Sequence, residues 1–344
     1  MERQFQPPPP RAVERGRQIL GTFNAPLEDV NLIDASLTPP LPRMARGFRL
    51  KEWQAVQLVN ERWFAIVALF DAKVMALVQA KLFDRQTREV WKFERKVLPG
   101  AFENPRQVLD STYAYRKPGC VVAFANRLKD GVIEVELEIP GDADRPPLVG
   151  RVVGRSTGAE LHVGSFPFGR GRGAVSHKAM LCAEGQLTLG ETPIVFDAAS
   201  SALLLDHHKG YYPYVMEWDW VTAAGVVGGA RVGLNLTRNA STDAARYNEN
   251  CVWIDGAPLL LPAVTFTRVG SGTEEIWRAQ DHAGRVDVRF HIEVDTRVDV
   301  NALIVRSKYR GPFGHVEGHV EPEGAERVTL DGMSAMAEEF YLRA

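Results

Sequence analysis

Chemically reactive side chains are densest in the segment from Asp206 to Trp220, DHHKGYYPYVMEWDW. It combines carboxylates, imidazoles, an amine, phenols and indoles. Surfaces rarely expose so many aromatic side chains, and cores rarely accept so many ionisable groups. The segment therefore predicts a partly enclosed cavity with polar and aromatic walls, where a ligand would bind.

Acid–base chemistry is the reaction type that these residues suit. A carboxylate beside an imidazole fixes the tautomer of the ring and raises its basicity, which is useful to a general acid or base. A solvated turn of mixed charge would explain the same residues. The candidate catalytic residues are Asp206, His207, His208 and Glu217.

Aromatic residues would form the binding surface. On a strand, Trp218 and Trp220 share one face, and Glu217 and Asp219 share the other. The two indoles would line a ligand cavity or, alternatively, fill an ordinary core. The candidate ligand-binding residues are Lys209, Tyr211, Tyr214, Trp218, Trp220, Asn235, Trp253 and Tyr309.

The motif HVEGH leaves a metal site open as an alternative. His315, Glu317 and His319 would point to one side of a strand, and their ligand types suit a borderline ion such as zinc. Same-face neighbours lie about 6.6 Å apart along a strand, so both histidines reach one ion only if the strand bends at a glycine. An edge strand with outward polar residues needs no ion. No cofactor is expected.

Alternation with a period of two predicts the elements that position these residues. Val132–Ile139 and Arg285–Thr296 alternate between apolar and polar residues, as half-buried antiparallel strands do. Trp63–Phe70 and Val74–Phe83 read as a buried hairpin. The expected fold is all-β and antiparallel, with two lipocalin-like barrels or sandwiches and an extended N-terminal arm.

The expected units are residues 1–42, 43–168 and 174–344. The first is a Pro-rich arm with a short helix near Val13–Leu20, and the others are the two β units. The Gly-rich segment Gly164–Gly173 is the expected boundary between them. Ser334–Leu342 fits either a short helix or a closing strand.

Composition narrows the expected binding partners and cellular location. The 344 residues carry a net charge of −2, which gives no reason to expect nucleic acid or an anionic membrane as a partner. Three well-separated cysteines suit a reducing compartment. Neither a secretory signal nor a membrane-spanning run of about 20 apolar residues is visible, so the expected location is the cytoplasm, without membrane insertion.

Several separated motifs carry a resemblance to a known family. They are, in order, KEWQAVQLVNERWF, FDRQTREVW, DHHKG followed by WDW, GLNLT, WIDG and SKYRGPFG. This set resembles a bacterial family catalogued only as a domain of unknown function, which implies no particular activity. More distantly, the layout resembles two-barrel lipocalin-like proteins that include carotenoid hydratases and related cyclases. That resemblance implies a fold and transfers no catalytic residue.

The predicted partner is a small lipophilic molecule in a partly enclosed cavity. Cofactor-free hydration, cyclisation or isomerisation would follow from the acidic and imidazole groups. Two alternatives use the same aromatic residues: a non-enzymatic carrier of a lipid or pigment, and a carbohydrate-binding β-sandwich with an open groove.

Overall fold

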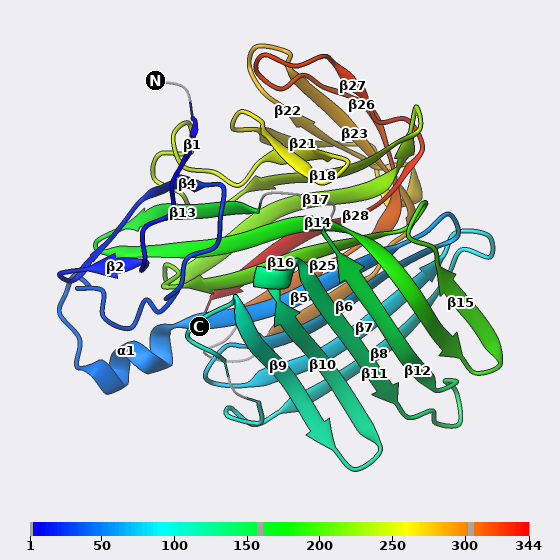
Figure 1. Ribbon diagram of the computed structural model, residues 1–344, viewed down its shortest axis with the longest axis horizontal. Helices are drawn as coiled ribbons and strands as arrows, with labels where there is room; N and C mark the ends of the chain where they lie inside the picture. Colours follow the sequence, from blue (N-terminus) through cyan, green and yellow to red (C-terminus); the bar gives the residue numbers. More distant parts are fainter. Residues whose placement is uncertain (1–2, 103, 157–160, 302–305, 344) are drawn as a thin grey trace.

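The computed structural model describes residues 3–102, 104–156, 161–301 and 306–343. Two large curled sheets make up the body, and the short helix α1 (Arg43–Arg49) lies beside them (Figure 1). Among the described residues, no helix is long and apolar enough to cross a membrane. The all-β prediction with two barrel-like units and an N-terminal arm is confirmed.

The first sheet is formed by strands from the first 210 residues. Its main path runs β8-β7-β6-β5-β16-β14-β12-β11-β10-β9, with β1, β4, β13 and β15 paired beside it. The strands are β1 (Phe5–Gln6), β4 (Gly21–Phe23), β5 (Lys51–Val59), β6 (Trp63–Asp71), β7 (Ala76–Asp84), β8 (Glu89–Val97), β9 (Asp110–Lys117), β10 (Cys120–Arg127), β11 (Val132–Ile139), β12 (Leu148–Arg155), β13 (His162–Gly169), β14 (Arg172–Leu189), β15 (Thr192–Phe196) and β16 (Ala202–Gly210).

The second sheet is formed by the remaining strands. Its main path runs β20-β19-β18-β17-β28-β26-β23-β22-β21, with β24, β25 and β27 at its sides. The strands are β17 (Val215–Val227), β18 (Ala230–Arg238), β19 (Cys251–Ile254), β20 (Ala257–Leu260), β21 (Thr265–Val269), β22 (Ile276–Gln280), β23 (Val286–Val294), β24 (Arg297–Asn301), β25 (Arg306–Arg310), β26 (Phe313–Val320), β27 (Val328–Thr329) and β28 (Met333–Arg343).

Each sheet curls around its own apolar core, and a third apolar cluster joins the two sheets. On β11, Ile133, Val135 and Leu137 are buried, as the period of two predicts. The joining cluster includes Leu204 of the first sheet and Trp220 of the second. The sheets thus pack back to back, and each barrel keeps a separate interior.

Two segments in which the sequence suggested or allowed a helix form strands instead. The predicted helix near Val13–Leu20 is wrong, because β2 (Val13–Glu14) and β3 (Arg17–Gln18) pair there. The turn residues Arg15 and Gly16 have φ values of 48° and 77°, as a two-residue type I′ hairpin requires. Ser334–Leu342 belongs to the strand β28 rather than to a helix.

The Gly-rich segment Gly164–Gly173 lies inside the first sheet. Its tip, Arg170 and Gly171, has φ values of 55° and 71° and connects β13 to β14 as another tight hairpin. The chain instead changes from one sheet to the other between β16 and β17. Strands β14 to β16 therefore belong to the first sheet, although the sequence suggested a boundary before them.

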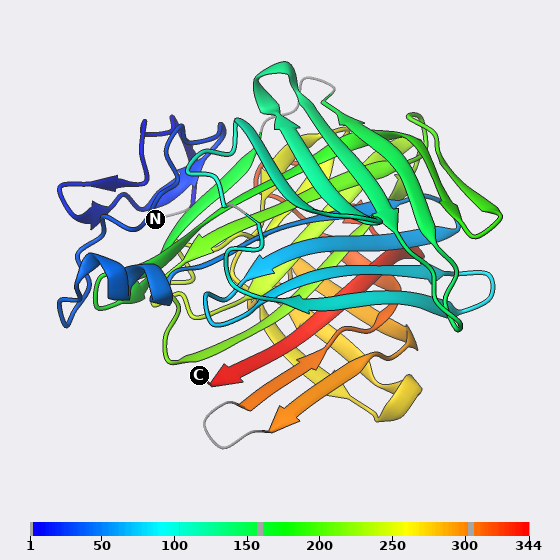
Figure 2. The same cartoon turned by 90° about the horizontal axis from the view of Figure 1, so that it is seen from below.

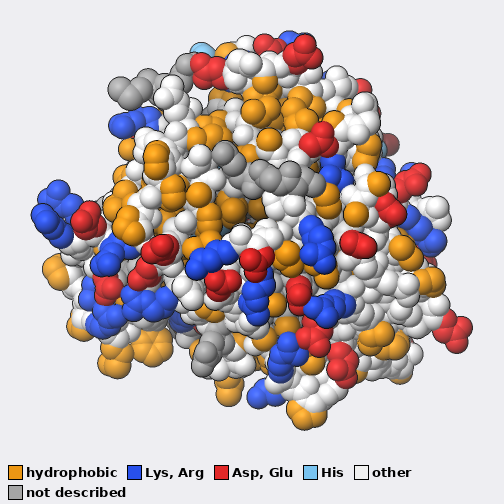
Figure 3. All heavy atoms as spheres, viewed as in Figure 1, with side chains coloured by type: hydrophobic (Ala, Val, Ile, Leu, Met, Phe, Trp, Pro, Cys, Tyr) orange, Lys and Arg blue, Asp and Glu red, His pale blue; other side chains and the backbone are white. Residues whose placement is uncertain are grey.

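The N-terminal arm packs against one end of the sheets (Figure 2). Phe23, Leu27 and Val30 of the arm join Val163 and Val175 in one buried cluster. The arm is therefore part of the folded body. On the face drawn in Figure 3, acidic and basic side chains are interspersed below an area rich in apolar side chains.

Candidate functional site

The central strand β16 carries ionisable residues on both faces. It pairs with β14 on one side and β5 on the other, so that Asp206 is opposite Lys178, and His208 is opposite Trp53. Because side chains alternate along a strand, Asp206 and His208 face the second sheet. His207 lies on the opposite face, inside the first barrel.

Four buried ionisable groups meet where the sheets pack together, and we call them the junction cluster: Lys178, Asp206, His208 and Glu249. Lys178 Nζ lies 2.7 Å from Asp206 Oδ1 and 3.4 Å from Glu249 Oε2. His208 Nε2 lies 3.2 Å from an oxygen of each carboxylate. Glu249 comes from the chain after β18, so residues from both halves of the sequence complete the cluster.

The groups of the junction cluster favour one another's charged forms. Burial opposes ionisation of Asp206, but Lys178 and His208 outweigh it and hold its pKa below the usual range. The same balance lowers the pKa of Glu249 to about 2. Burial alone would lower the pKa of His208, yet the two carboxylates raise it. With His208 protonated, two cations face two anions.

Aromatic rings cover the junction cluster. The indole of Trp53 stacks on the His208 ring with centroids 4.5 Å apart, and its N–H donates to Asp206 Oδ2 at 3.3 Å. Trp218 of β17 stacks against Trp53 with centroids 5.8 Å apart. The hydroxyl of Tyr212 lies 3.5 Å from His208 Nδ1. The imidazole is thus held between two carboxylates, an indole and a phenol.

A third carboxylate, that of Glu338 on β28, lies next to Trp218. It accepts hydrogen bonds from the Trp218 indole at 3.1 Å and from the Tyr309 hydroxyl at 2.9 Å. Burial, with the nearby charge of Asp206, raises the pKa of Glu338. Lys81 Nζ lies 3.4 Å from the Tyr309 hydroxyl, and burial lowers its pKa to about 8. Burial thus shifts the pKa values of Glu338 and Lys81 in the directions that favour their neutral forms.

Two of the sequence-predicted residues lie in the first barrel, away from the junction cluster. His207 Nε2 is hydrogen-bonded to the Tyr113 hydroxyl at 2.7 Å, and burial lowers the pKa of this histidine well below its usual value. Lys209 Nζ pairs with Glu52 Oε1 at 2.7 Å. The structure therefore separates His207 and Lys209 from Asp206 and His208, their neighbours in the chain.

Other predicted residues divide between surface and interior. Glu217 is exposed, with Arg238 at 3.8 Å, and Tyr214 is 54% exposed. Trp253 is buried in the cluster that joins the sheets. The Trp220 indole donates to Asn235 Oδ1 at 2.7 Å and lies 5.3 Å from Lys178 Nζ. Trp220 and Asn235 therefore pack against the junction cluster.

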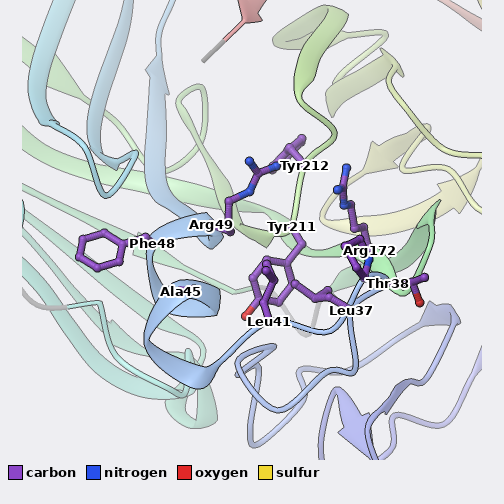
Figure 4. A pocket seen from close by; sticks show the side chains of 10 residues that line it. Leu37, Thr38, Leu41, Ala45, Phe48, Arg49, Arg172, Tyr211 and Tyr212 are labelled. Carbon is purple, nitrogen blue, oxygen red and sulfur yellow. The ribbon is translucent and has the colours of Figure 1, made fainter.

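A pocket of about 450 Å³ adjoins this region. Apolar side chains of the arm and α1 line it, together with Arg49, Arg172, Tyr211 and Tyr212. Figure 4 shows both arginine side chains extending in the direction of Tyr212. Because the Tyr212 hydroxyl reaches His208 on the other side, this residue separates the pocket from the junction cluster.

The HVEGH motif is only partly brought together. His315 and Glu317 approach His291 of the neighbouring strand β23, and one ligand atom from each lies within 4.8 Å of the others. His319 lies apart and contacts the Gly284 carbonyl at 3.2 Å. The third group is therefore a histidine that the motif does not contain.

Sequence reasoning missed four residues that contact the predicted ones: Lys178, Glu249, Trp53 and Glu338. Lys178 had a detectable signal, because it precedes the apolar run AMLCA in a strand that is buried on both faces. A lysine in such a strand needs a buried acid as its partner. Glu249 and Glu338 are remote in sequence, and the pattern around them gives no comparable signal.

Comparisons with known proteins place the fold. The structure is similar to that of CghA, solved with Sch210972, with a TM-score of 0.56 and 14% identity over 84% of this chain and 88% of that chain. It is also similar to kievitone hydratase from Nectria haematococca, with a TM-score of 0.51 and 12% identity over 85% of this chain and 88% of that chain. These similarities support the fold-level resemblance to two-barrel hydratases and cyclases.

Sequence comparison gives the family. No curated protein matches the chain significantly. A family model matches residues 11–343, which is nearly the whole length. The chain belongs to the family described as a domain of unknown function, DUF2804.

Proposed function

We propose that this protein binds a small, partly apolar molecule between its two sheets and catalyses cofactor-free acid–base chemistry on it. The observation that carries this proposal is the pair Asp206 and Glu338. Their pKa values are shifted in opposite directions, and Asp206 contributes to the shift of Glu338. Two carboxyl groups separated in this way supply one proton donor and one anion at the same pH.

The proton donor in this proposal is Glu338. Burial favours its neutral form, and the group remains half-buried rather than sealed. In a hydration, the Glu338 carboxyl would protonate one carbon of a polarised C=C bond and become a carboxylate. Water would add to the other carbon and return its surplus proton to Glu338, which completes the cycle. In an isomerisation, loss of a different substrate proton to the same carboxylate would restore it.

The carboxylate that remains ionised in this proposal is Asp206. It is fixed by Lys178 and His208 and would stabilise positive charge that develops on the substrate. Trp53 and Trp218 would hold the apolar part of the substrate by stacking, since each indole is half-buried. Lys178, His208 and Glu249 would act as positioning residues for Asp206.

In this proposal the substrate extends from the pocket bounded by Tyr212, past that side chain, to Glu338, so the lining of the pocket suggests the class of molecule. Its lining is largely apolar, but Arg49 and Arg172 add two guanidinium groups. Burial, together with the charges of Arg49 and Arg170, lowers the pKa of Arg172, so positive charge is concentrated there. An amphipathic anion, such as an aryl or alkyl carboxylate, suits both features because arginine binds carboxylates in a bidentate manner.

A carrier without catalytic activity is the second candidate. It is favoured by the junction cluster itself, in which each charge already has an opposite partner. A cluster of this kind can serve to fix how the sheets pack. The pocket beside Tyr212 would then hold the ligand without chemistry.

Native mass spectrometry of gently purified protein, before and after denaturation, tests the proposal first. We expect a released organic molecule with an anionic group. Incubating that molecule or its unsaturated analogues with wild-type protein and with Glu338→Gln then separates the two candidates. Product formed only by wild type supports the enzyme. Binding by both proteins without product establishes the carrier and overturns the acid–base role.

A further inference from the structure

The outward faces of β23 and β26 bring two histidines together. His291 and His315 are directly opposite each other in the register of these strands. Their rings are stacked, with centroids 5.1 Å apart and planes 9° from parallel. The neighbours Phe290 and Ile292 point into the second barrel and are buried, so the two imidazoles point outward. Both rings remain partly exposed.

Carboxylates flank the two imidazoles. Glu317 Oε2 lies 3.1 Å from His291 Nε2, and Glu293 Oε1 lies 2.7 Å from His315 Nδ1. Glu317 is two residues after His315 and therefore on the same face of β26. The side chains of Glu293 and Glu317 are 13% and 42% exposed, so ions in solution can reach this face.

We propose that His291, His315 and Glu317 bind a divalent transition-metal ion of the zinc class. One ligand atom from each residue already lies within 4.8 Å of the others. In a tetrahedral zinc site with bonds of about 2.0 Å, ligand atoms lie about 3.3 Å apart. Rotation of these partly exposed side chains closes the difference without moving the strands.

The donor set selects the kind of ion. Two imidazole nitrogens and one carboxylate oxygen suit zinc, copper or nickel, whereas calcium and magnesium prefer oxygen ligands alone. Glu293 acts as a positioning residue: it holds Nδ1 of His315 and leaves Nε2 free for the ion. Water would fill the fourth position. The site is independent of the proposed acid–base function.

The cation paired with Glu317 opposes the ion. Arg289 lies 3.9 Å from Glu317 and is paired with it across the two strands. Its charge competes for the carboxylate and repels a divalent ion. Replacing Arg289 by Ala should therefore strengthen binding at this site, whereas an ion bound elsewhere on the surface would not respond.

Titration calorimetry of the full chain with Zn²⁺, after treatment with EDTA, tests the site. A Cys182→Ser background removes the partly exposed thiol as an alternative ligand. We expect one ion per chain. His291→Ala and His315→Ala should each weaken binding roughly tenfold or more, on the scale of lost ligand interactions. His319→Ala should leave the affinity unchanged, although it alters the same sequence motif.

Melting curves add a readout of correct folding. Without metal, each variant should melt near the wild-type temperature, because the substituted side chains point outward. Zn²⁺ should raise the melting temperature of wild type but not of His291→Ala. Absence of Zn²⁺ binding by wild type, or equal affinity in a His291→Ala/His315→Ala double variant, overturns the proposal.

Discussion

Asp206 and Glu338 each accept a hydrogen bond from the indole N–H of one member of a stacked tryptophan pair. Trp53 of the first sheet donates to Asp206, and Trp218 of the second donates to Glu338. The two carboxyl groups are therefore tied to the same aromatic contact between the sheets. A ligand inserted at this contact would meet one carboxyl group whose pKa is lowered and one whose pKa is raised.

Glu338→Gln should lower turnover of the identified substrate by about 10²–10⁴-fold, the usual contribution of a general acid. Ligand affinity should change little, because the amide keeps the shape of the side chain and an oxygen that accepts from Trp218. Product formation and binding are measured separately on the same samples. Glu136→Gln, exposed on β11, is the matched control. Unchanged turnover in Glu338→Gln would remove this residue from the mechanism.

Lys178→Met should destabilise the protein by about 3–5 kcal/mol, the cost of leaving buried charges without a partner. It leaves Asp206 and Glu249 facing each other with His208 alone between them. Urea unfolding measures the difference. Arg151→Met breaks an exposed pair with Glu134 and should cost less than about 1 kcal/mol. Equal losses of unfolding free energy in the two variants would show that the buried junction cluster stabilises the protein no more than an exposed ion pair does.

His177 should make the folded protein sensitive to acid. The Leu27 N–H donates a hydrogen bond to His177 Nε2 at 3.4 Å, so this nitrogen carries no proton. Burial, with the charges of His208 and Lys209, lowers its pKa to about 3. In an unfolded chain the pKa of a histidine is about 6.5. Between these values only the unfolded chain binds the proton, so stability falls as pH falls through that window.

His177→Gln should therefore flatten the pH dependence of the unfolding free energy. The slope should decrease by up to about 1.4 kcal/mol per pH unit between the two pKa values. Urea titrations at a series of pH values give the slope. His282→Gln, at an exposed position, is the control. An equally steep slope in His177→Gln and wild type would contradict a neutral, buried His177.

The double variant Arg49→Gln/Arg172→Gln should weaken binding of an amphipathic anion roughly tenfold or more, because each charged hydrogen bond contributes about 1.5–3 kcal/mol. Anilinonaphthalene sulfonate, followed by fluorescence, is a suitable probe, and a neutral dye of similar size should be far less affected. Arg116→Gln/Arg151→Gln removes two exposed arginines of the first sheet and serves as the control. Equal loss for both dyes would point to disturbed packing rather than charge recognition.

The fold was largely predictable because alternation reports directly on burial. Trp63–Phe70 and Val74–Phe83 correspond to the paired strands β6 and β7, and Val132–Ile139 is a strand with its apolar residues inside. The short arm was harder to predict. A two-residue turn such as Arg15–Gly16 interrupts too few residues to distinguish a small hairpin from one turn of helix.

The site was only half predictable, for a reason of geometry. The strand β16 separates Asp206 and His208 from His207 and Lys209, whereas sequence reasoning grouped Asp206, His207 and His208 in one catalytic set. Partners such as Glu249 and Glu338 depend on the register and packing of strands that are far apart in sequence. Contacts of that kind require the three-dimensional arrangement.

The strand β16 has consequences for how the sequence can vary. All nine of its residues are buried and both faces carry ionisable groups, so the faces differ in the partners they meet rather than in exposure. A slip of one residue against β5 and β14 would turn His207 and Lys209 toward the second sheet and carry Asp206 and His208 into the first barrel. Insertions or deletions of odd length within this strand would therefore destroy both polar networks at once. Changes of even length would preserve the faces, so length variation among relatives should follow that parity.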